Sequence, residues 1–279
     1  MKPAIVMQTD FSRNSSAVAA MYGVCQSVDP EVSLFDLTHG IPPFNIFAGS
    51  HSLKDVAEFW PKGTIFISVV DPGVGTSRKG SVALLKNGQY VVTPDNGTLT
   101  HLHAHIGIEA IREIDMSVNR WPTTESCNIF HGRDVFAYTA IRLASGIIGF
   151  EGVGPAYPVS DVVLIAYDAP KFEENSFTGI IDSSGPNFGL VSSNITDKLF
   201  LAHNVQLGDF FNVEITHGEK TVYQDRVEFQ KAFGCVEKGA PILFVGETAT
   251  IQIALREQNI VTRYGIGAGP EWRMRITKA

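Results

Sequence analysis

The sequence predicts an N-terminal α/β domain with a mostly parallel sheet, followed by a C-terminal domain of antiparallel strands. In the first 70 residues, apolar strand-like segments alternate with amphipathic helical segments, which implies parallel pairing with right-handed crossovers. After about Phe172 the segments become short and alternating, which is typical of a small antiparallel β-barrel or sandwich. We therefore expect domains at residues 1–158 and 173–279, joined by a linker at residues 159–172.

Each expected element has a local signal. Ser15 and Ser16 are candidate N-caps for a helix that Pro30 ends, and Asn87-Gly88 predicts a hairpin turn. The expected N-terminal strands are residues 4–9, 33–37, 64–70, 81–86, 90–93 and 110–114, with further helices at 45–60 and 135–144. The expected C-terminal strands are residues 177–181, 210–215, 221–223, 242–245, 250–255 and 273–276.

Composition narrows the class of function. The chain has 279 residues, of which 44% are hydrophobic, and no apolar run approaches the roughly 18 residues that span a bilayer. Its formal net charge of −7 disfavours a nucleic-acid partner, which needs a basic face. Three cysteines, odd in number and far apart, argue against a disulfide framework. We expect a cytoplasmic enzyme with no membrane partner.

The most informative stretch runs from Thr64 to Arg78. Its first half is β-branched and aromatic and predicts a buried central strand. Its second half is a glycine-rich loop that begins with Asp71 and ends with Arg78. Ligands bind at the carboxyl ends of strands in open α/β sheets, so this loop is a candidate site. A tight turn with a surface ion pair explains the loop equally well.

Other motifs give weaker signals. The histidines of the run His101, His103 and His105 are typical zinc ligands, but no neighbouring Cys, His or Asp completes a site, so we favour a solvent-facing helix or loop. The loop at residues 71–78 lacks the Gly-Lys-Ser/Thr ending of a phosphate loop. No G-x-S-x-G elbow is present, and Cys127 has no basic or helical setting that would activate a thiolate.

Several motifs together resemble the S-adenosyl-L-methionine hydroxide adenosyltransferases, which are hydrolases related to fluorinases and chlorinases. The resemblance covers most of residues 4–150, in the same order and at similar spacing. It rests on TDF at 9–11, DLTHGIPPFNI at 36–46, WPKG at 60–63, SVVDPGVGTSR at 68–78, TPDNGTLT at 93–100 and FHGRDVFA at 130–137.

The resemblance implies a C-terminal antiparallel β-barrel and a homotrimer with the ligand at the subunit interface. It implies that water displaces L-methionine from C5′ of S-adenosyl-L-methionine and yields adenosine, without a cofactor or metal. The family's catalytic set corresponds to Asp71, Arg78 and His131, its ribose-binding carboxylate to Asp10, and its aromatic near the ribose to Phe44. Spacing alone leaves His131 equally open to catalysis and to capping the following helix.

The C-terminal half departs from the family pattern. The expected Asp corresponds to Asp182 and the Phe-Gly pair to Phe188-Gly189, but Leu190 replaces the following Asn. We expect Asn187, beside Phe188, to take the place of that missing amide as an adenine contact. These departures leave a second hypothesis open, a nucleoside-binding protein of the same fold with little turnover. A metallohydrolase using the histidine run at 101–105 is a third.

Overall fold

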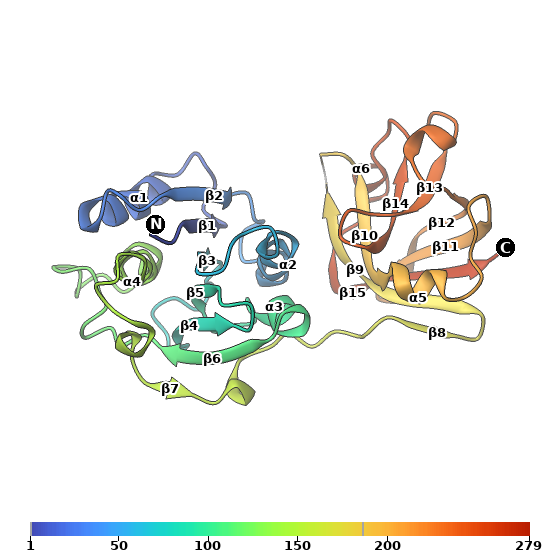
Figure 1. Cartoon of the computed structure of the whole chain (residues 1–279). Helices are drawn as coiled ribbons and strands as arrows, with labels where there is room; N and C mark the ends of the chain where they lie inside the picture. The colour runs from blue at the N-terminus through green and yellow to red at the C-terminus, as the bar shows by residue number, and fades with distance from the viewer. Residues whose placement is uncertain (1, 186) are drawn as a thin grey trace. The chain divides into compact units, whose positions relative to one another are not determined.

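A computed structural model describes residues 2–185 and 187–279 of the chain. The chain folds as two compact units, one ending at Ile165 and the other running from Ala166 to Ala279 (Figure 1). The division falls inside residues 159–172, the segment that we expected as a linker. We describe each unit by itself.

The N-terminal unit contains a seven-stranded mixed sheet in the order β2-β1-β3-β5-β4-β6-β7. The strands are β1 (Ile5–Thr9), β2 (Leu34–Thr38), β3 (Ile65–Val69), β4 (Gly80–Leu85), β5 (Tyr90–Pro94), β6 (Ile108–Glu113) and β7 (Ala156–Tyr157). The expected parallel pairing holds for β2, β1, β3 and β5. The expected hairpin is confirmed as β4–β5, and antiparallel pairing then continues to β6 and β7.

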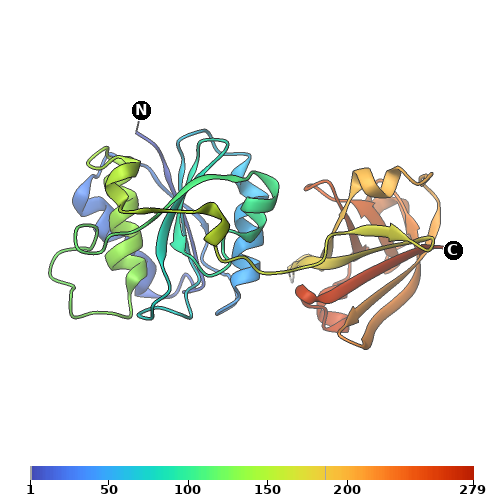
Figure 2. The same ribbon diagram turned by 90° about the horizontal axis from the view of Figure 1, so that it is seen from below.

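Helices cover both faces of this sheet, as Figure 2 shows. Because strand side chains alternate, Ile5 and Met7 of β1 face one helical layer and Val6 faces the other. The first layer contains α1 (Ser16–Val28), the π-helix η1 (Gly132–Ala137) and α4 (Tyr138–Ala144). The second contains α2 (Ile46–Ala57) and α3 (Thr100–His105), and two short 3₁₀ segments, η2 (Phe150–Val153) and η3 (Val159–Asp161), lie nearer the end of the unit.

Two helices begin where their capping residues predict. The Ser15 hydroxyl accepts a hydrogen bond from the Ala17 N–H at 3.2 Å, and Asn45 Oδ1 accepts one from the Ala48 N–H at 2.9 Å. In contrast, the expected helix at 135–144 begins three residues early. Its first part, η1, has π-helical hydrogen bonding, a feature that is common at functional sites.

The C-terminal unit is a seven-stranded β-barrel with one added edge strand. The order is β10-β14-β13-β12-β11-β15-β9-β8, and a further β10–β9 pair closes the barrel. Pairing is antiparallel throughout except between β12 and β13, which run parallel. The elements are β8 (Lys171–Glu173), β9 (Ser176–Gly185), β10 (Leu190–Thr196), α5 (Asp197–Leu201), β11 (Phe210–His217), β12 (Lys220–Phe229), η4 (Phe233–Cys235), β13 (Pro241–Val245), β14 (Thr250–Leu255), α6 (Ile260–Tyr264) and β15 (Gly269–Lys278).

The sequence did not reveal strand β10, because its Ser-Ser-Asn centre has low strand propensity. The barrel accommodates these polar residues by supplying hydrogen-bond partners inside it, as Ser193 shows. Ser193 is fully buried, and its hydroxyl donates to the Ile251 carbonyl at 2.8 Å.

The histidine run lies on helix α3, where His101 is fully buried. His101 Nδ1 lies 2.9 Å from the Ser50 hydroxyl, so the expectation of a solvent-facing run is wrong for this residue. In residues 2–185 and 187–279, no group of three or more His, Cys, Asp or Glu side chains is placed to hold a metal ion. None of the helices in the described part of the chain has the length and apolarity to cross a membrane.

Candidate active site

Two carboxylates follow adjacent parallel strands of the N-terminal unit. Strands β1 and β3 pair in register, with Thr9 opposite Val69. Asp10 therefore leaves the sheet beside the segment that leads to Asp71, and its N–H donates to the Val69 carbonyl at 3.3 Å. This is the carboxyl edge of the parallel strands, where α/β sheets bind ligands.

The loop from Asp71 to Arg78 folds back on itself. The Thr76 hydroxyl donates to the Gly73 carbonyl at 2.7 Å, which holds the turn closed. Gly75 has a φ of 77°, and a Cβ there would lie 2.7 Å from the Asn128 carbonyl oxygen. A side chain is thus excluded by both backbone conformation and space. This turn returns Arg78 to the carboxylate of Asp71.

Arg78 and Asp71 form a two-point ion pair. Arg78 Nε donates to Asp71 Oδ1 at 2.8 Å, and Nη2 donates to Oδ2. Only 11% of the Arg78 side chain is exposed, and its guanidinium also lies over the ring of Phe136, 5.3 Å from the centroid. The pair is therefore not the solvent-screened surface ion pair that the sequence left open. Its planar geometry fixes both side chains in orientation.

His131 is the third member of this cluster. Arg78 Nη2 also donates to His131 Nδ1 at 3.0 Å. Since a guanidinium has no acceptor, Nδ1 carries the lone pair and the ring proton is on Nε2. Burial and the charges of Arg78 and Arg120 hold the pKa of His131 below its ordinary value. The imidazole is therefore neutral at pH 7.

His131 lies immediately before η1, but among the described residues its side chain makes no capping hydrogen bond to that helix. The capping role that spacing left open is thus not what the structure supports. The following Gly132 is closely packed, since a Cβ there would meet Phe11 and Val69 at 3.3 Å. Close packing of the helix start fixes His131 against Arg78.

Asp10 and Phe44, two further predicted site residues, are joined by a hydrogen bond. Asp10 Oδ2 accepts from the Phe44 N–H at 2.8 Å. Phe44 has a φ of 65°, and 71% of its surface is exposed. A left-handed backbone conformation is strained in a residue that has a Cβ. The hydrogen bond from the Phe44 N–H to the Asp10 carboxylate helps to stabilise this conformation. An exposed aromatic ring thus lies on a loop that is tied to this carboxylate.

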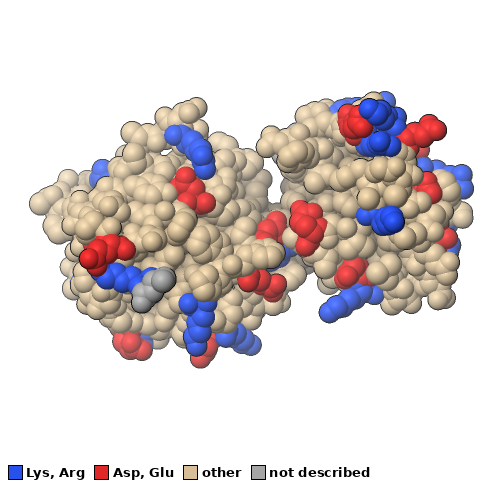
Figure 3. All heavy atoms as spheres, turned by 45° about the horizontal axis from the view of Figure 1, so that its top comes forward, with Lys and Arg blue, Asp and Glu red and all other residues tan. Residues whose placement is uncertain are grey.

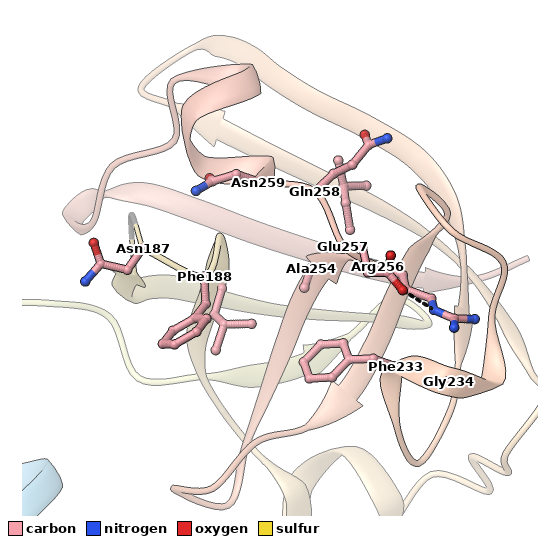
Figure 4. Close-up of a pocket in the computed structure, with 11 residues that line it drawn as sticks. Asn187, Phe188, Phe233, Gly234, Ala254, Arg256, Glu257, Gln258 and Asn259 are labelled. Atoms are coloured by element: carbon pink, nitrogen blue, oxygen red, sulfur yellow. Dashed lines mark ion pairs between the residues drawn. The ribbon is translucent and has the colours of Figure 1, made fainter.

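The C-terminal unit contains a separate cavity of about 660 Å³, a volume typical of small-molecule sites. Asn187 and Phe188, two of the predicted substrate-binding residues, are among its lining residues, and 81% of Phe188 is exposed. In Figure 4 the rings of Phe188 and Phe233 lie below the side chains of Gln258 and Asn259. The other lining residues are Leu190, Gly234, Ala254, Leu255, Arg256 and Glu257.

Asp182 is not among the residues that line this cavity. It is buried within β9, and the pKa of Tyr167 is raised by burial and by the Asp182 charge. The structure therefore brings Asp71, Arg78 and His131 together, ties Asp10 to Phe44, and places Asn187 beside Phe188.

Sequence reasoning missed several contributors. Arg120 lies in a loop without a motif, and only its proximity to His131 reveals its effect on the pKa. Phe136 and Phe233 lie in apolar surroundings that look like ordinary core or loop sequence. On the face drawn in Figure 3, Lys and Arg side chains are interspersed with acidic ones rather than gathered into a basic patch.

Comparisons with known proteins show the family to which the chain is similar. Residues 5–154 match the family model of the SAM hydroxide adenosyltransferase N-terminal domain, and residues 184–273 match that of the C-terminal domain. The chain is 30% identical over 281 residues to the (R)-S-adenosyl-L-methionine hydrolase of Salinispora tropica, covering 99% of this chain and 98% of that one. It is also 30% identical over 284 residues to the hydrolase of the same name from Thermus thermophilus, covering 98% and 100%.

A fluorinase and a solved structure also match along nearly the whole chain. The fluorinase of Actinopolyspora mzabensis is 22% identical over 305 residues, which cover 100% of this chain and 98% of the fluorinase. The crystal structure of an uncharacterized conserved protein from Thermotoga maritima matches with a TM-score of 0.87 at 32% identity, covering 98% of this chain and 100% of that one. Both domain models and the full-length relatives thus agree, and the chain belongs to the SAM hydroxide adenosyltransferase family.

Proposed function

We propose that this protein is an S-adenosyl-L-methionine hydrolase, in which water attacks C5′ and produces adenosine and L-methionine. The buried cluster of Asp71, Arg78 and His131 is the observation that carries the proposal. Two relatives that are 30% identical along their full length are named as hydrolases of this substrate. The sulfonium departs as a neutral thioether, so the leaving group needs no proton.

Water with a pKa of about 15.7 is a weak nucleophile until it is oriented and its charge is stabilised. Arg78 already occupies the Nδ1 lone pair of His131 and one position on each Asp71 oxygen. Asp71 retains further lone pairs, so we assign it as the acceptor of the water proton. His131 then donates its Nε2–H to the water oxygen.

Arg78 has the electrostatic part in this scheme. Its fixed positive charge stabilises the negative charge that develops on the attacking oxygen. Because the guanidinium is already held by two partners, little reorganisation accompanies the reaction. We assign water rather than halide as the nucleophile, because Asp71 and His131 are both present, whereas the resemblance places other residues there in halogenating relatives.

Substrate recognition is divided among several residues. We assign Asp10 to binding of the ribose diol, whose two hydroxyl groups donate hydrogen bonds to the carboxylate. We assign Phe44 to packing beside the ribose. Phe188 and Asn187 suit an adenine base, since one offers a ring face for stacking and the other offers amide hydrogen bonds. Asp182 remains a proposed contact by resemblance alone, because it is buried in β9.

We further propose that the protein assembles as a homotrimer, with the ligand at the subunit interface. The family resemblance supports this, together with the exposed rings of Phe44 and Phe188. Sedimentation velocity should give the mass of three 30.4 kDa chains. A mass of one chain at micromolar concentration would contradict the assembly.

Incubation with S-adenosyl-L-methionine in isotopically labelled water tests the reaction directly. We expect label in the 5′-hydroxyl of adenosine, with no 5′-halo product when halide is added. A halogenated product would overturn the choice of nucleophile. Co-purified nucleoside with no methionine release over hours would instead support the second hypothesis, a nucleoside-binding protein. Loss of turnover with a chelator would support the metallohydrolase.

Arg78→Lys should lower kcat/KM for adenosine formation by about 100-fold or more, because an ammonium cannot hold Asp71 at two points and His131 at once. Asp71→Ala and His131→Ala should cause losses of similar size. Arg142→Lys is the matched control, since Arg142 donates to the Val118 carbonyl and to Asn119 Oδ1, and neither partner is a predicted site residue. Near-parental turnover in all three site variants would contradict the assignment of these residues to catalysis.

The pH profile should follow the neutral form of His131. Its pKa lies below the ordinary value of 6.5, so kcat/KM should fall as the pH is lowered, with the midpoint of the decline below pH 6.5. The sign follows because a protonated ring can no longer accept from Arg78 and is repelled by its charge. Adenosine affinity, measured over the same range, reports whether the protein stays folded. A decline with its midpoint above pH 6.5 would rule out His131 as its source.

A further inference from the structure

A chain of hydrogen-bonded polar side chains begins at the residue before the proposed ribose-binding Asp10. Thr9, the last residue of β1, places its hydroxyl 2.9 Å from His39 Nδ1. His39 Nε2 in turn lies 3.0 Å from Asp36 Oδ1. Thr9 and His39 are both buried, so the bond between them is shielded from water, whereas the His39–Asp36 bond is only partly buried because 31% of the Asp36 side chain is exposed. No part of the proposed mechanism uses either residue.

With a neutral His39 ring, the partners in this chain assign a direction to each hydrogen bond. Burial would raise the pKa of Asp36, but hydrogen bonds from Tyr22 and His39 outweigh burial and hold that pKa below its ordinary value. An ionised carboxylate only accepts, so His39 Nε2 carries the proton and donates it. His39 Nδ1 then accepts from the Thr9 hydroxyl, and the Thr9 oxygen accepts from the Phe11 N–H at 3.1 Å.

His39 also holds the chain on the other side of Asp10. Its carbonyl accepts from the Ser12 N–H at 2.9 Å. Ser12 has a φ of 65°, so a left-handed turn follows Asp10 directly. One residue thus contacts the Thr9 side chain through its own side chain and the Ser12 backbone through its main chain. Asp10 lies between these two contacted positions in the sequence.

We propose that His39 and Thr9 are positioning residues, which set the Asp10 carboxylate for two-point binding of a ribose diol. The inference rests on the proposed role of Asp10 in the hydrolase reaction. Asp36 keeps His39 in the tautomer that accepts from Thr9, and Arg13 Nη2, 3.3 Å from Asp36 Oδ2, adds a surface ion pair. If the chain acts by placing the Asp10 carboxylate, its effect on binding is confined to ligands whose hydroxyl groups that carboxylate binds.

A purely structural role for the chain makes a different prediction. Loss of buried hydrogen bonds would loosen the β1 edge and weaken every ligand of this site alike. Loss of carboxylate position would weaken only a ligand whose diol Asp10 binds. Comparison of adenosine with 2′,3′-dideoxyadenosine separates the two, because only adenosine has the diol.

Calorimetric titration of the full-length protein with the two nucleosides gives their ratio of Kd values. The parent should favour adenosine by on the order of 100-fold, as expected for two charge-assisted hydrogen bonds. Asp10→Asn should remove most of this preference. Thr9→Val should reduce it to about tenfold or less while changing the Kd of the dideoxynucleoside little.

Two substitutions of His39 resolve the direction of the chain. His39→Asn retains an acceptor near the Nδ1 position and should keep more of the preference than His39→Gln, which retains a donor near Nε2. Thr139→Val is the matched control, because Thr139 is also a buried threonine of the N-terminal unit, donating to the Asn119 carbonyl at 3.4 Å. It should leave the ratio unchanged. Thermal melting confirms that each variant is folded.

The outcomes separate this inference from the proposed function. An unchanged ratio in Asp10→Asn, or no adenosine binding by the parent, would remove the role of Asp10 and the inference with it. A reduced ratio in Asp10→Asn, with parental ratios in Thr9→Val and His39→Gln, would overturn the inference and leave the role of Asp10 intact. Equal weakening of both nucleosides in the His39 and Thr9 variants would assign the chain to stability alone.

Discussion

The site depends on one buried interaction, the two-point ion pair between Arg78 and Asp71. A buried guanidinium cannot be left without its partners, since an unpaired buried charge costs several kcal/mol. Arg78 meets this demand with both Asp71 oxygens and His131 Nδ1. The same contacts that satisfy its charge fix the orientation of the carboxylate and the tautomer of the imidazole. The electrostatic need of one side chain therefore sets the geometry of the whole cluster.

The parallel strands explain why these groups meet. Because β1 and β3 run in the same direction and in register, the residues that follow them emerge at one edge. Asp10 leaves the first strand and Asp71 follows the second. His131 reaches this edge from a distant part of the sequence, at the tightly packed start of η1. One edge of the sheet thus carries both the residues proposed to activate water and the carboxylate proposed to bind the ribose.

Local sequence signals predicted much of the fold. They failed where a residue is stabilised by partners that are distant in the sequence. Ser15 and Asn45 mark helix starts because a side-chain oxygen satisfies free N–H groups there, whatever the rest of the chain does. Strand β10 escaped prediction because its serines are stabilised by the barrel around them. His101 looked solvent-facing for a similar reason, since only the fold supplies Ser50 as its buried partner. Asp71, Arg78 and His131 were named from motifs, whereas Arg120 carries no motif.

The sequence by itself determined the two-domain order, the alternation that builds the parallel strands, and the identity of the three residues proposed for catalysis. The first two follow from local chemistry, and the third is what the resemblance to the family implies. Only the tertiary structure decided that Arg78 is buried rather than part of a surface ion pair. It also decided that His131 accepts rather than caps, and that His39 contacts residues on both sides of Asp10 in the sequence. Burial and proton direction depend on partners far apart in the chain, and folding alone brings those partners together.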